Sequence, residues 1–390
     1  MSATLRDKYA IVGVGQSPIG EVPDMDSLSL LALAMKAAIE DAGLTNKHID
    51  GMITRGPDDV YTHHQHMGQI LGINPRFSAS LASGGASQCA AVAMAAMAIE
   101  AGMCETVVTG YGRNTWSRTR KRGTRQGSER GLRLPGEPQE FAPEFGLFGA
   151  TAMHAFGCRR HMHLYGTTKD QMGAVAVAFR RHASKNPLAQ MREPITLEDY
   201  HRAKPIVEPY NMLDCSLNSD GAGAVVVTRA ERARDLRQRP VTIMGFGQKN
   251  NLRGWFHDDN MVTLGGLESA AVAYRMAGIG PEDVDVAQIY DCFTYIVLAT
   301  LEDYGFCKKG EGGPFVASGA LELDGALPTN TSGGQLSEGH IEGMLQIVEA
   351  VRQLRRDHPP DRLVKDAEIA IVSGHGGNTV CHSTLILRRG

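Results

Sequence analysis

The sequence predicts an α/β protein built from two copies of one β-α-β-α-β unit, and three observations carry this prediction. Short apolar segments of strand length alternate with longer segments that have helical periodicity. The segment 42–50, with Ala-Gly before its turn and Asp after it, returns as 277–285 at one fixed offset (277 − 42 and 285 − 50 both give 235). A helix that leads into a strand near residues 89–112 is echoed near residues 341–376. Such self-similarity is typical of a duplicated unit.

The composition is that of an ordinary globular protein. Of the 390 residues 42% are hydrophobic and 21% are charged, which allows one large core or two moderate ones. The net charge of −3 gives no reason to expect nucleic acid or a membrane as a partner, and no stretch approaches the roughly 20 apolar residues of a membrane span. The seven cysteines contain no C-x-x-C pair and the amino terminus has no apolar signal core, so we expect a cytoplasmic protein.

The first copy is expected to start with a buried strand over Tyr9–Gly15. Its Gly-x-Gly ending is only a weak signal for a dinucleotide site, because Pro18 opens a loop where a pyrophosphate-binding helix would be needed. We therefore expect no nucleotide cofactor there. The elements that follow are a helix over residues 27–41, a strand over 49–53, a helix over 89–101, a strand over 106–112 and a returning strand over 220–228.

The halves are predicted to span residues 1–235 and 236–390, with an insertion at about 113–205 in the first. The insertion carries a basic run between Arg113 and Arg125, which is either a solvated loop or a region that attracts an anionic substrate such as a nucleotide phosphate. The expected elements outside the first copy are helices over residues 171–183, 267–276, 293–304 and 341–354 and strands over 286–289 and 369–376.

Tyr290 is the strongest catalytic candidate in the sequence. The apolar strand 286–289 delivers Tyr290 and Asp291 to its carboxyl end, where ligands collect in an open α/β sheet. A phenol and a carboxylate side by side are poor core residues. We expect Tyr290 to act in catalysis and Asp291 to be mostly structural.

Two histidines are the candidates that could stand opposite Tyr290. His340 is expected to open a helix after the Gly333-Gly334 pair, and His375 lies between two glycines at the carboxyl end of a strand, where the backbone approaches closely. The remaining histidine groups, at 63–66 and 161–163, have no Cys or carboxylate at zinc spacing, so we expect no metal.

Five motifs spread over the whole chain form a recognisable set. They are Ile11–Gly20, His163–Gln171, Asp214–Ala224, Tyr290–Phe293 and Asn330–His340. Together they resemble the thiolase superfamily, and within it the sterol-carrier-protein-type and lipid-transfer-type thiolase-like proteins. The resemblance implies the thiolase fold, with two half-folds in a five-layer αβαβα body and an inserted loop domain. It also implies a homodimer and coenzyme A thioesters as substrates, with no cofactor bound permanently.

The chain departs from the thiolases at both family cysteines. A thiolase has a nucleophilic Cys at the amino end of the helix in the first half, where the helix dipole favours a thiolate. Registering this helix by its far end places that position on Gly85, and Cys89 comes four residues later. Ser87 is expected to cap the helix, and the second family cysteine falls on Ser373. An acyl-enzyme cycle therefore lacks both its nucleophile and its proton-shuttling thiol.

Tyr290 is a further departure, because thiolases have Asn here and the sterol-carrier type usually has His. A Tyr at this position resembles the thiolase-like aldolases that cleave a carbon–carbon bond in the side chain of steroid-type CoA thioesters. Those proteins have a second Tyr where this chain has His340. The resemblance implies retro-aldol cleavage of a β-hydroxyacyl-CoA with a steroid or other bulky side chain. It also implies a small zinc-ribbon/OB-fold partner protein in a heterotetramer.

Retro-aldol cleavage needs a base for the β-hydroxyl proton and donors for the enolate that forms on the thioester oxygen. Tyr290 is the candidate base, provided that a neighbouring cation or donor tunes its pKa of about 10. His340 can polarise the thioester or relay the proton, and His375 is a third partner. Two alternatives stay open: an acyltransferase thiolase that uses Cys89 as a displaced nucleophile, and a non-catalytic subunit that binds CoA-linked lipids.

Overall fold

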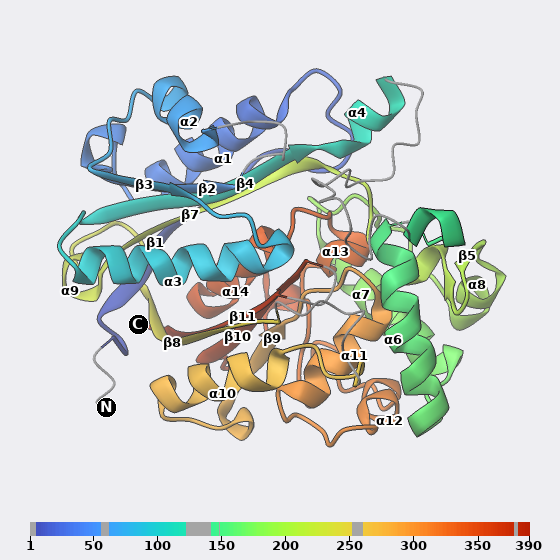
Figure 1. The fold of residues 1–390 in the computed structure, drawn as a ribbon. Helices are drawn as coiled ribbons and strands as arrows, with labels where there is room; N and C mark the ends of the chain where they lie inside the picture. The colour runs from blue at the N-terminus through green and yellow to red at the C-terminus, as the bar shows by residue number, and fades with distance from the viewer. Residues whose placement is uncertain (1–4, 56–61, 122–141, 148, 252–259, 378–380) are drawn as a thin grey trace.

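The computed structural model describes residues 5–55, 62–121, 142–147, 149–251, 260–377 and 381–390. Within these residues the main sheet has the strand order β3-β2-β4-β7-β1-β8-β11-β10-β9 (Figure 1). Its strands are β1 (Tyr9–Gln16), β2 (Gly51–Arg55), β3 (Phe77–Ser80), β4 (Thr106–Asn114), β7 (Asp220–Arg229), β8 (Val241–Asn250), β9 (Val286–Gln288), β10 (Ile369–Gly376) and β11 (Cys381–Arg389).

The sheet consists of two half-sheets with the same internal order. In the first half β2, β4, β7 and β1 lie side by side, and in the second half β9, β10, β11 and β8 do. In each half the first pair is parallel and the next two pairs are antiparallel. The halves meet where β1 pairs with β8, at Ala10–Thr242 and Ile11–Val241. The duplication predicted from the sequence is therefore confirmed, whereas the boundary at residue 235 stays a prediction.

Asp50 and Asp285, which are 235 residues apart, make the same kind of backbone contact in the two halves. Each follows a short 3-10 turn, η1 (Asn46–His48) in the first half and η6 (Pro281–Asp283) in the second. The Asp50 carboxylate accepts hydrogen bonds of 2.8 and 2.9 Å from the backbone N–H groups at the start of β4. The Asp285 carboxylate accepts two of 2.9 Å from those at the start of β10. Each carboxylate ties the start of one parallel strand to that of its neighbour.

Helices complete a five-layer arrangement (Figure 1). Helices α1 (Ser27–Asp41) and α2 (His63–Leu71) cover the outer face of the first half-sheet, and α10 (Gly266–Ala277) and α11 (Thr294–Asp303) lie on the outer side of the second. Helices α3 (Ser87–Glu100) and α14 (Met344–Arg355) lie between the half-sheets, so both are buried nearly all round. This is the αβαβα body of the predicted thiolase fold.

The Gly-x-Gly ending of β1 has a packing explanation. A Cβ on Gly13 would lie 2.0 Å from the carbonyl oxygen of Ala38, and one on Gly15 would lie 2.2 Å from that of Ala34. Helix α1 thus packs directly on the backbone of β1, and only glycine permits this approach. The two glycines serve helix–strand contact.

The insertion leaves the first half-sheet after β4 and returns at β7. In Figure 1 its helices α6, α7 and α8 form a group at one side of the two half-sheets, beside α11. Within the described residues no helix is long and apolar enough to cross a membrane. Residues 122–125 of the basic run lie outside the described part. The segment between β4 and β7 contains α4 (Thr115–Lys121), η3 (Ala142–Phe145), α6 (Gly149–Tyr165), α7 (Lys169–Lys185), α8 (Leu197–Arg202), β5 (Pro205–Val207), β6 (Tyr210–Asn211) and η4 (Met212–Asp214). The remaining short elements are η2 (Gly84–Ala86), α9 (Ala230–Ala233), α12 (Gly312–Ala317), α13 (Gly334–Ser337) and η7 (Pro360–Arg362).

Candidate active site

Tyr290 and His340 meet in the structure. Tyr290 lies two residues after β9, and its backbone N–H donates to the Ser373 hydroxyl at 2.8 Å. Its hydroxyl is 3.3 Å from Nε2 of His340. The expectation that His340 opens a helix is wrong: it lies in the loop between α13 and α14, because Gly343 at φ +85° delays the start of α14.

The loop and imidazole of His340 are held from several sides. Its Nδ1 lies 3.1 Å from the Ser216 hydroxyl, and its backbone N–H donates to the Ser219 hydroxyl at 3.0 Å. Its carbonyl oxygen accepts a hydrogen bond of 3.5 Å from Arg113, the first residue of the basic run. The imidazole therefore stands between the hydroxyls of Ser216 and Tyr290, in a fixed position.

Burial decides the resting protonation of this pair. It raises the pKa of Tyr290 well above 10, and the smaller opposing effect of Arg113 does not reverse this. Burial, and then the positive charges of Arg113 and Arg55, hold the pKa of His340 well below 6.5. The resting site therefore holds a protonated phenol beside a neutral imidazole. The hypothesis that Tyr290 acts as a base stays a prediction, and at rest the phenol bears its proton.

The Tyr290 ring fills the space beside Gly85, the position that the sequence register of the helix assigns to the thiolase nucleophile. A Cβ built on Gly85 would lie 2.1 to 2.3 Å from the Cε2, Cζ and Oη atoms of Tyr290. No side chain fits at Gly85 while the phenol is in place. A side chain at Gly85 and the phenol of Tyr290 thus exclude each other.

Cys89 is part of the core between the half-sheets. It is 1% exposed, and its thiol donates to the Val372 carbonyl oxygen at 3.9 Å. Burial raises the pKa of this thiol to about 12, so it is protonated at neutral pH and a poor nucleophile. Ser87, at the start of α3, accepts the backbone N–H of Ser83 at 2.8 Å, which is a structural contact but not the expected helix cap.

We expect Cys89→Ala to retain turnover within about threefold of the wild type, because a buried neutral thiol contributes packing and no chemistry. Iodoacetamide should leave Cys89 unlabelled in the folded protein. Steady-state kinetics and peptide mass spectrometry measure both. Loss of all activity together with selective labelling of Cys89 would support the acyltransferase alternative.

Asp291 supports the loop opposite Tyr290. It is fully buried and accepts hydrogen bonds from the backbone N–H groups of Gln335 at 2.9 Å and Leu336 at 3.1 Å. The Gln346 amide adds a third at 2.9 Å. These bonds anchor α13, which precedes His340, and agree with a structural function.

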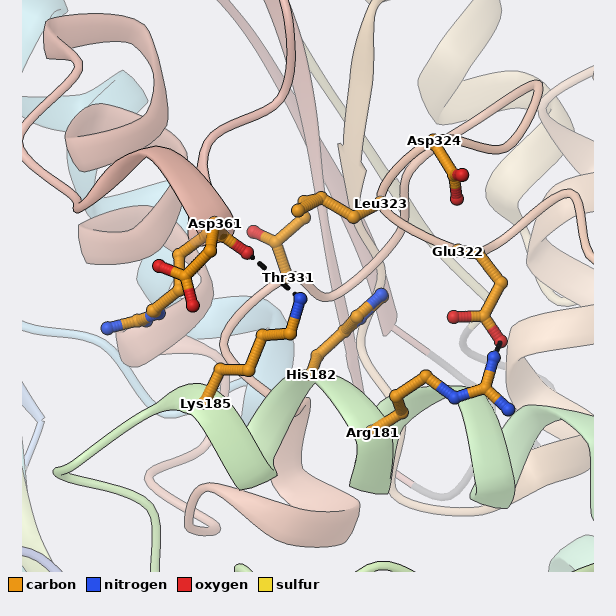
Figure 2. Close-up of a pocket in the computed structure, with 9 residues that line it drawn as sticks. Arg181, His182, Lys185, Glu322, Leu323, Asp324, Thr331 and Asp361 are labelled. Carbon is orange, nitrogen blue, oxygen red and sulfur yellow. Dashed lines mark hydrogen bonds and ion pairs between the residues drawn. The ribbon is translucent and has the colours of Figure 1, made fainter.

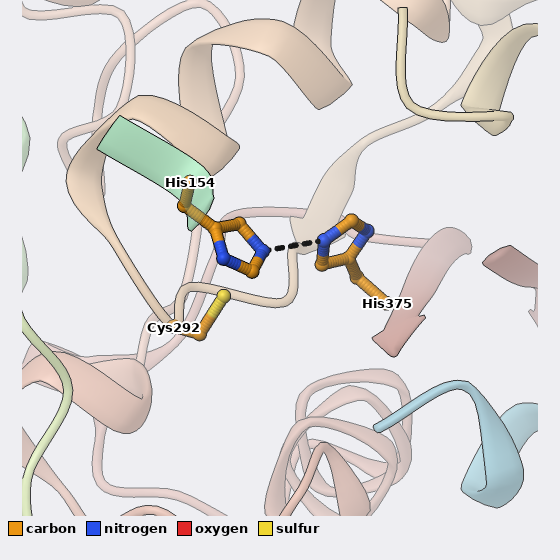
Figure 3. A group of neighbouring side chains, drawn as sticks. All are labelled: His154, Cys292 and His375. Atoms are coloured by element: carbon orange, nitrogen blue, oxygen red, sulfur yellow. Dashed lines mark hydrogen bonds between the residues drawn. The ribbon is translucent and has the colours of Figure 1, made fainter. Parts of the chain in front are cut away.

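His375 lies on the other side of Tyr290 and has a partner that the sequence did not indicate. The ring centroids of Tyr290 and His375 are 6.1 Å apart. The Nε2 atom of His375 is 3.1 Å from Nε2 of His154, which lies on α6 of the insertion (Figure 3). No pattern in the sequence indicates where α6 packs, so His154 could not be assigned to the site beforehand.

Cys292 completes a buried group with these two histidines (Figure 3). One nitrogen or sulfur atom of each residue lies within 4.8 Å of the others, and such a donor set suits a soft divalent ion. The sequence-based prediction of no metal considered only neighbours along the chain and missed this group. Because the two imidazoles are hydrogen-bonded to each other, we interpret the group as part of a hydrogen-bond chain.

A separate pocket lies beside the carboxyl-terminal end of α7 (Figure 2). His182, which lines it, has Nδ1 3.1 Å from the Asn330 carbonyl oxygen, and the Asn330 amide pairs with the backbone of Ile289, next to Tyr290. The pocket is thus linked to Tyr290 through Asn330 and Ile289. Its lining, which contains none of the three candidate residues, is Arg181, His182, Lys185, Glu322, Leu323, Asp324, Thr331, Asp361 and Arg362.

Glu338, two residues before His340, predicts a pH dependence of stability. It is buried and accepts hydrogen bonds from Ser332 at 2.6 Å and Asn186 at 3.2 Å, and burial raises its pKa from 4.5 to about 7. The folded protein keeps this proton up to about pH 7, whereas the unfolded chain loses it near pH 4.5. The contribution of the protonated Glu338 carboxyl to the free energy of unfolding is therefore complete below pH 4.5, and it is lost as the pH rises to 7.

We expect Glu338→Gln, which is neutral at every pH, to exceed the wild type in unfolding free energy at pH 8, by on the order of 3 kcal/mol. At pH 4 the two proteins should be nearly equal. Denaturant unfolding at pH 4, 6 and 8 measures the difference. A difference that is the same at all three pH values would contradict the buried neutral carboxyl.

Comparisons with known proteins identify the family to which the chain belongs. Residues 247–389 match the family model described as thiolase C-terminal domain-like. The chain is 38% identical over 358 residues to the steroid side-chain-cleaving aldolase of Thermomonospora curvata, covering 89% of this chain and 90% of that protein. It is also 38% identical over 362 residues to the 17-hydroxy-3-oxo-4-pregnene-20-carboxyl-CoA lyase of Mycobacterium tuberculosis, covering 90% and 92%.

A solved structure named Ltp2-ChsH2(DUF35) aldolase superimposes with a TM-score of 0.89 at 35% identity, covering 99% of this chain and 98% of that one. Fold and site thus define a thiolase-type scaffold in which the phenol of Tyr290 fills the space at Gly85. Within that class, the chain belongs to the family of the thiolase-like aldolases that act on CoA thioesters. The family and fold predicted from the sequence motifs are confirmed.

Proposed function

We propose that this chain is a carbon–carbon lyase that splits β-hydroxyacyl-CoA thioesters by a retro-aldol reaction, without an acyl-enzyme intermediate. One observation carries the proposal: the Tyr290 ring fills the space at Gly85, and its hydroxyl is hydrogen-bonded to His340. A thiolase-type acyl transfer has no nucleophile here, whereas a retro-aldol reaction needs none. The relatives named as steroid side-chain-cleaving aldolase and CoA lyase support a steroid or similarly bulky acyl group.

The reaction needs a proton donor at one end and a proton acceptor at the other. Tyr290, which is protonated and hydrogen-bonded to His340, donates a hydrogen bond to the thioester oxygen. Enolate charge develops on this oxygen during the reaction. The β-hydroxyl gives its proton to a neutral imidazole as the Cα–Cβ bond breaks. Tyr290 then supplies the proton to Cα. The products are a ketone or aldehyde and a shortened acyl-CoA, and no atom is gained or lost.

The two imidazoles beside Tyr290, those of His340 and His375, are the proton acceptors available for this scheme. Both are neutral at rest, because burial holds the pKa of each well below 6.5. A neutral imidazole has one lone pair and one N–H group, and its hydrogen bonds fix which nitrogen has which. The choice between the two residues therefore depends on their partners.

We also propose that the chain forms a cytoplasmic homodimer that works with a small zinc-ribbon/OB-fold protein in a heterotetramer, and that CoA enters only as part of the thioester. The name of the solved aldolase joins two components, Ltp2 and ChsH2, which supports a partner subunit. All seven cysteines are free, as is usual in a reducing compartment. Size-exclusion chromatography with light scattering, with and without a co-expressed partner, measures the assembly.

Product analysis tests the proposed reaction. The protein, alone and with its partner, is incubated with a β-hydroxyacyl-CoA and separately with a β-ketoacyl-CoA plus free CoA. We expect consumption of the hydroxy substrate, with a carbonyl compound and a shortened acyl-CoA in equal amounts. Consumption of the keto substrate alone, and only with free CoA, would establish the acyltransferase instead. An inert complex that binds acyl-CoA would indicate the non-catalytic alternative.

A further inference from the structure

We propose that His154 is a positioning residue that holds His375 in the tautomer whose Nδ1 lone pair accepts the β-hydroxyl proton. This inference rests on the proposed retro-aldol reaction and deepens it, because it names the proton acceptor. A chain of hydrogen bonds runs from the backbone of α6 through His154 to His375 and supports this assignment.

The first hydrogen bond in this chain determines which ring nitrogen of His154 carries the hydrogen. Its Nδ1 lies 2.7 Å from the Ala150 carbonyl oxygen, which can only accept a hydrogen bond, so Nδ1 bears the hydrogen. Burial lowers the pKa of His154 to about 4, and the ring has no second hydrogen at neutral pH. The Nε2 atom of His154 therefore carries a lone pair.

The second hydrogen bond determines which ring nitrogen of His375 carries the hydrogen. Because Nε2 of His154 can only accept, the 3.1 Å contact requires that Nε2 of His375 donates. The lone pair of the neutral His375 ring is then on Nδ1. Among the described residues this Nδ1 has no hydrogen-bond partner, although the residue is only 2% exposed. A buried acceptor without a partner is rare in folded proteins, and a donor on the substrate would satisfy it.

His340 has a different set of partners. Besides two hydroxyls it has a hydrogen bond with the Leu217 backbone, which raises its pKa against the larger lowering by burial. Its two nitrogens face the hydroxyls of Ser216 and Tyr290, and each hydroxyl can donate or accept. Its ring contacts the phenol oxygen directly through Nε2. We therefore assign different functions to the two histidines. His340 stabilises the acid, Tyr290, and His375 is the base.

The step balances without a further reactant. The O–H bond of the β-hydroxyl breaks and an N–H bond forms at Nδ1 of His375. The electron pair left on oxygen becomes the carbonyl bond as the Cα–Cβ bond breaks, and the Cα–Cβ pair forms the thioester enolate. Cα takes the proton of Tyr290, and the proton on His375 restores the phenol.

The test compares His154→Leu, which removes the acceptor, with His154→Gln, whose side-chain oxygen can accept from His375. We expect His154→Leu to lower kcat at least 100-fold with KM within about threefold, since a wrong tautomer of a catalytic histidine is costly. His154→Gln should recover kcat to within about tenfold of the wild type. His163→Leu is the matched control, because His163 is exposed on the same helix, and it should behave as the wild type.

Nitrogen NMR of the full-length protein labelled with ¹⁵N-histidine reads the tautomer without relying on activity. With the His375 signals assigned from His375→Gln, we expect hydrogen on Nε2 and a lone pair on Nδ1 in the wild type. Hydrogen on Nδ1, or wild-type kcat in a folded His154→Leu, would overturn the inference. So would stoichiometric zinc that is lost in Cys292→Ser. A wild-type protein that does not cleave the hydroxy substrate would instead overturn the proposed function.

Discussion

Tyr290→Phe is expected to lower kcat by about 10²- to 10⁴-fold, the usual range for removing a positioned acid or base. The substitution deletes the hydroxyl that contacts His340 and keeps the ring that fills the space at Gly85. The fold should therefore survive, and the thermal midpoint should move by no more than a few degrees. Rates of β-hydroxyacyl-CoA cleavage and thermal unfolding measure the two effects.

Tyr274→Phe is the matched control for this variant. The Tyr274 side chain is half-buried, and its hydroxyl donates to the Tyr304 carbonyl oxygen at 3.2 Å. The Tyr274→Phe variant should therefore lose little activity in the cleavage assay. Equal and small losses in both variants would show that the phenol of Tyr290 has no chemical function.

Gly85→Ala is expected to abolish activity and destabilise the protein, although it adds a single methyl group. The new Cβ would lie within 2.1 to 2.3 Å of three atoms of the Tyr290 ring, so the ring must leave its position. Overpacking of this kind typically costs about 1–3 kcal/mol. Denaturant unfolding gives the free energy, and cleavage of the hydroxy substrate gives the activity.

A double-mutant cycle separates this clash from a general intolerance at Gly85. In a Tyr290→Leu background the ring is absent, and the same Gly85→Ala change should cost much less free energy of unfolding. The two effects would then be strongly non-additive, as expected for residues in contact. Additive effects would contradict the account in which the phenol excludes the thiolase nucleophile.

The duplicated fold could be predicted because its signals are local. The offset of 235 between Asp50 and Asp285 reflects a real constraint, since each carboxylate holds the N–H groups that open the next parallel strand. Helix α1 and strand β10 have the predicted bounds, because buried strands and amphipathic helices leave clear periodic patterns. Gly13 and Gly15 are explained by contact with α1.

The site was only partly predictable, because its chemistry depends on contacts between distant segments. Tyr290 and His340 could be selected from their places after a strand and a glycine pair, and the fold brings them together. The raised pKa of Tyr290 could not be foreseen, since it follows from complete burial. His154 was missed because it reaches His375 across 221 positions of sequence, through an insertion whose path no pattern indicates.

Intact-protein mass spectrometry during turnover tests the central claim most directly. The wild-type chain with its partner is mixed with saturating β-hydroxyacyl-CoA and quenched in acid at intervals from the first turnover to steady state. If Tyr290 and its histidines cleave the carbon–carbon bond without a nucleophile, the chain retains its unmodified mass while shortened acyl-CoA accumulates. A transient mass increase equal to an acyl group, formed and lost at the rate of turnover, would contradict the account.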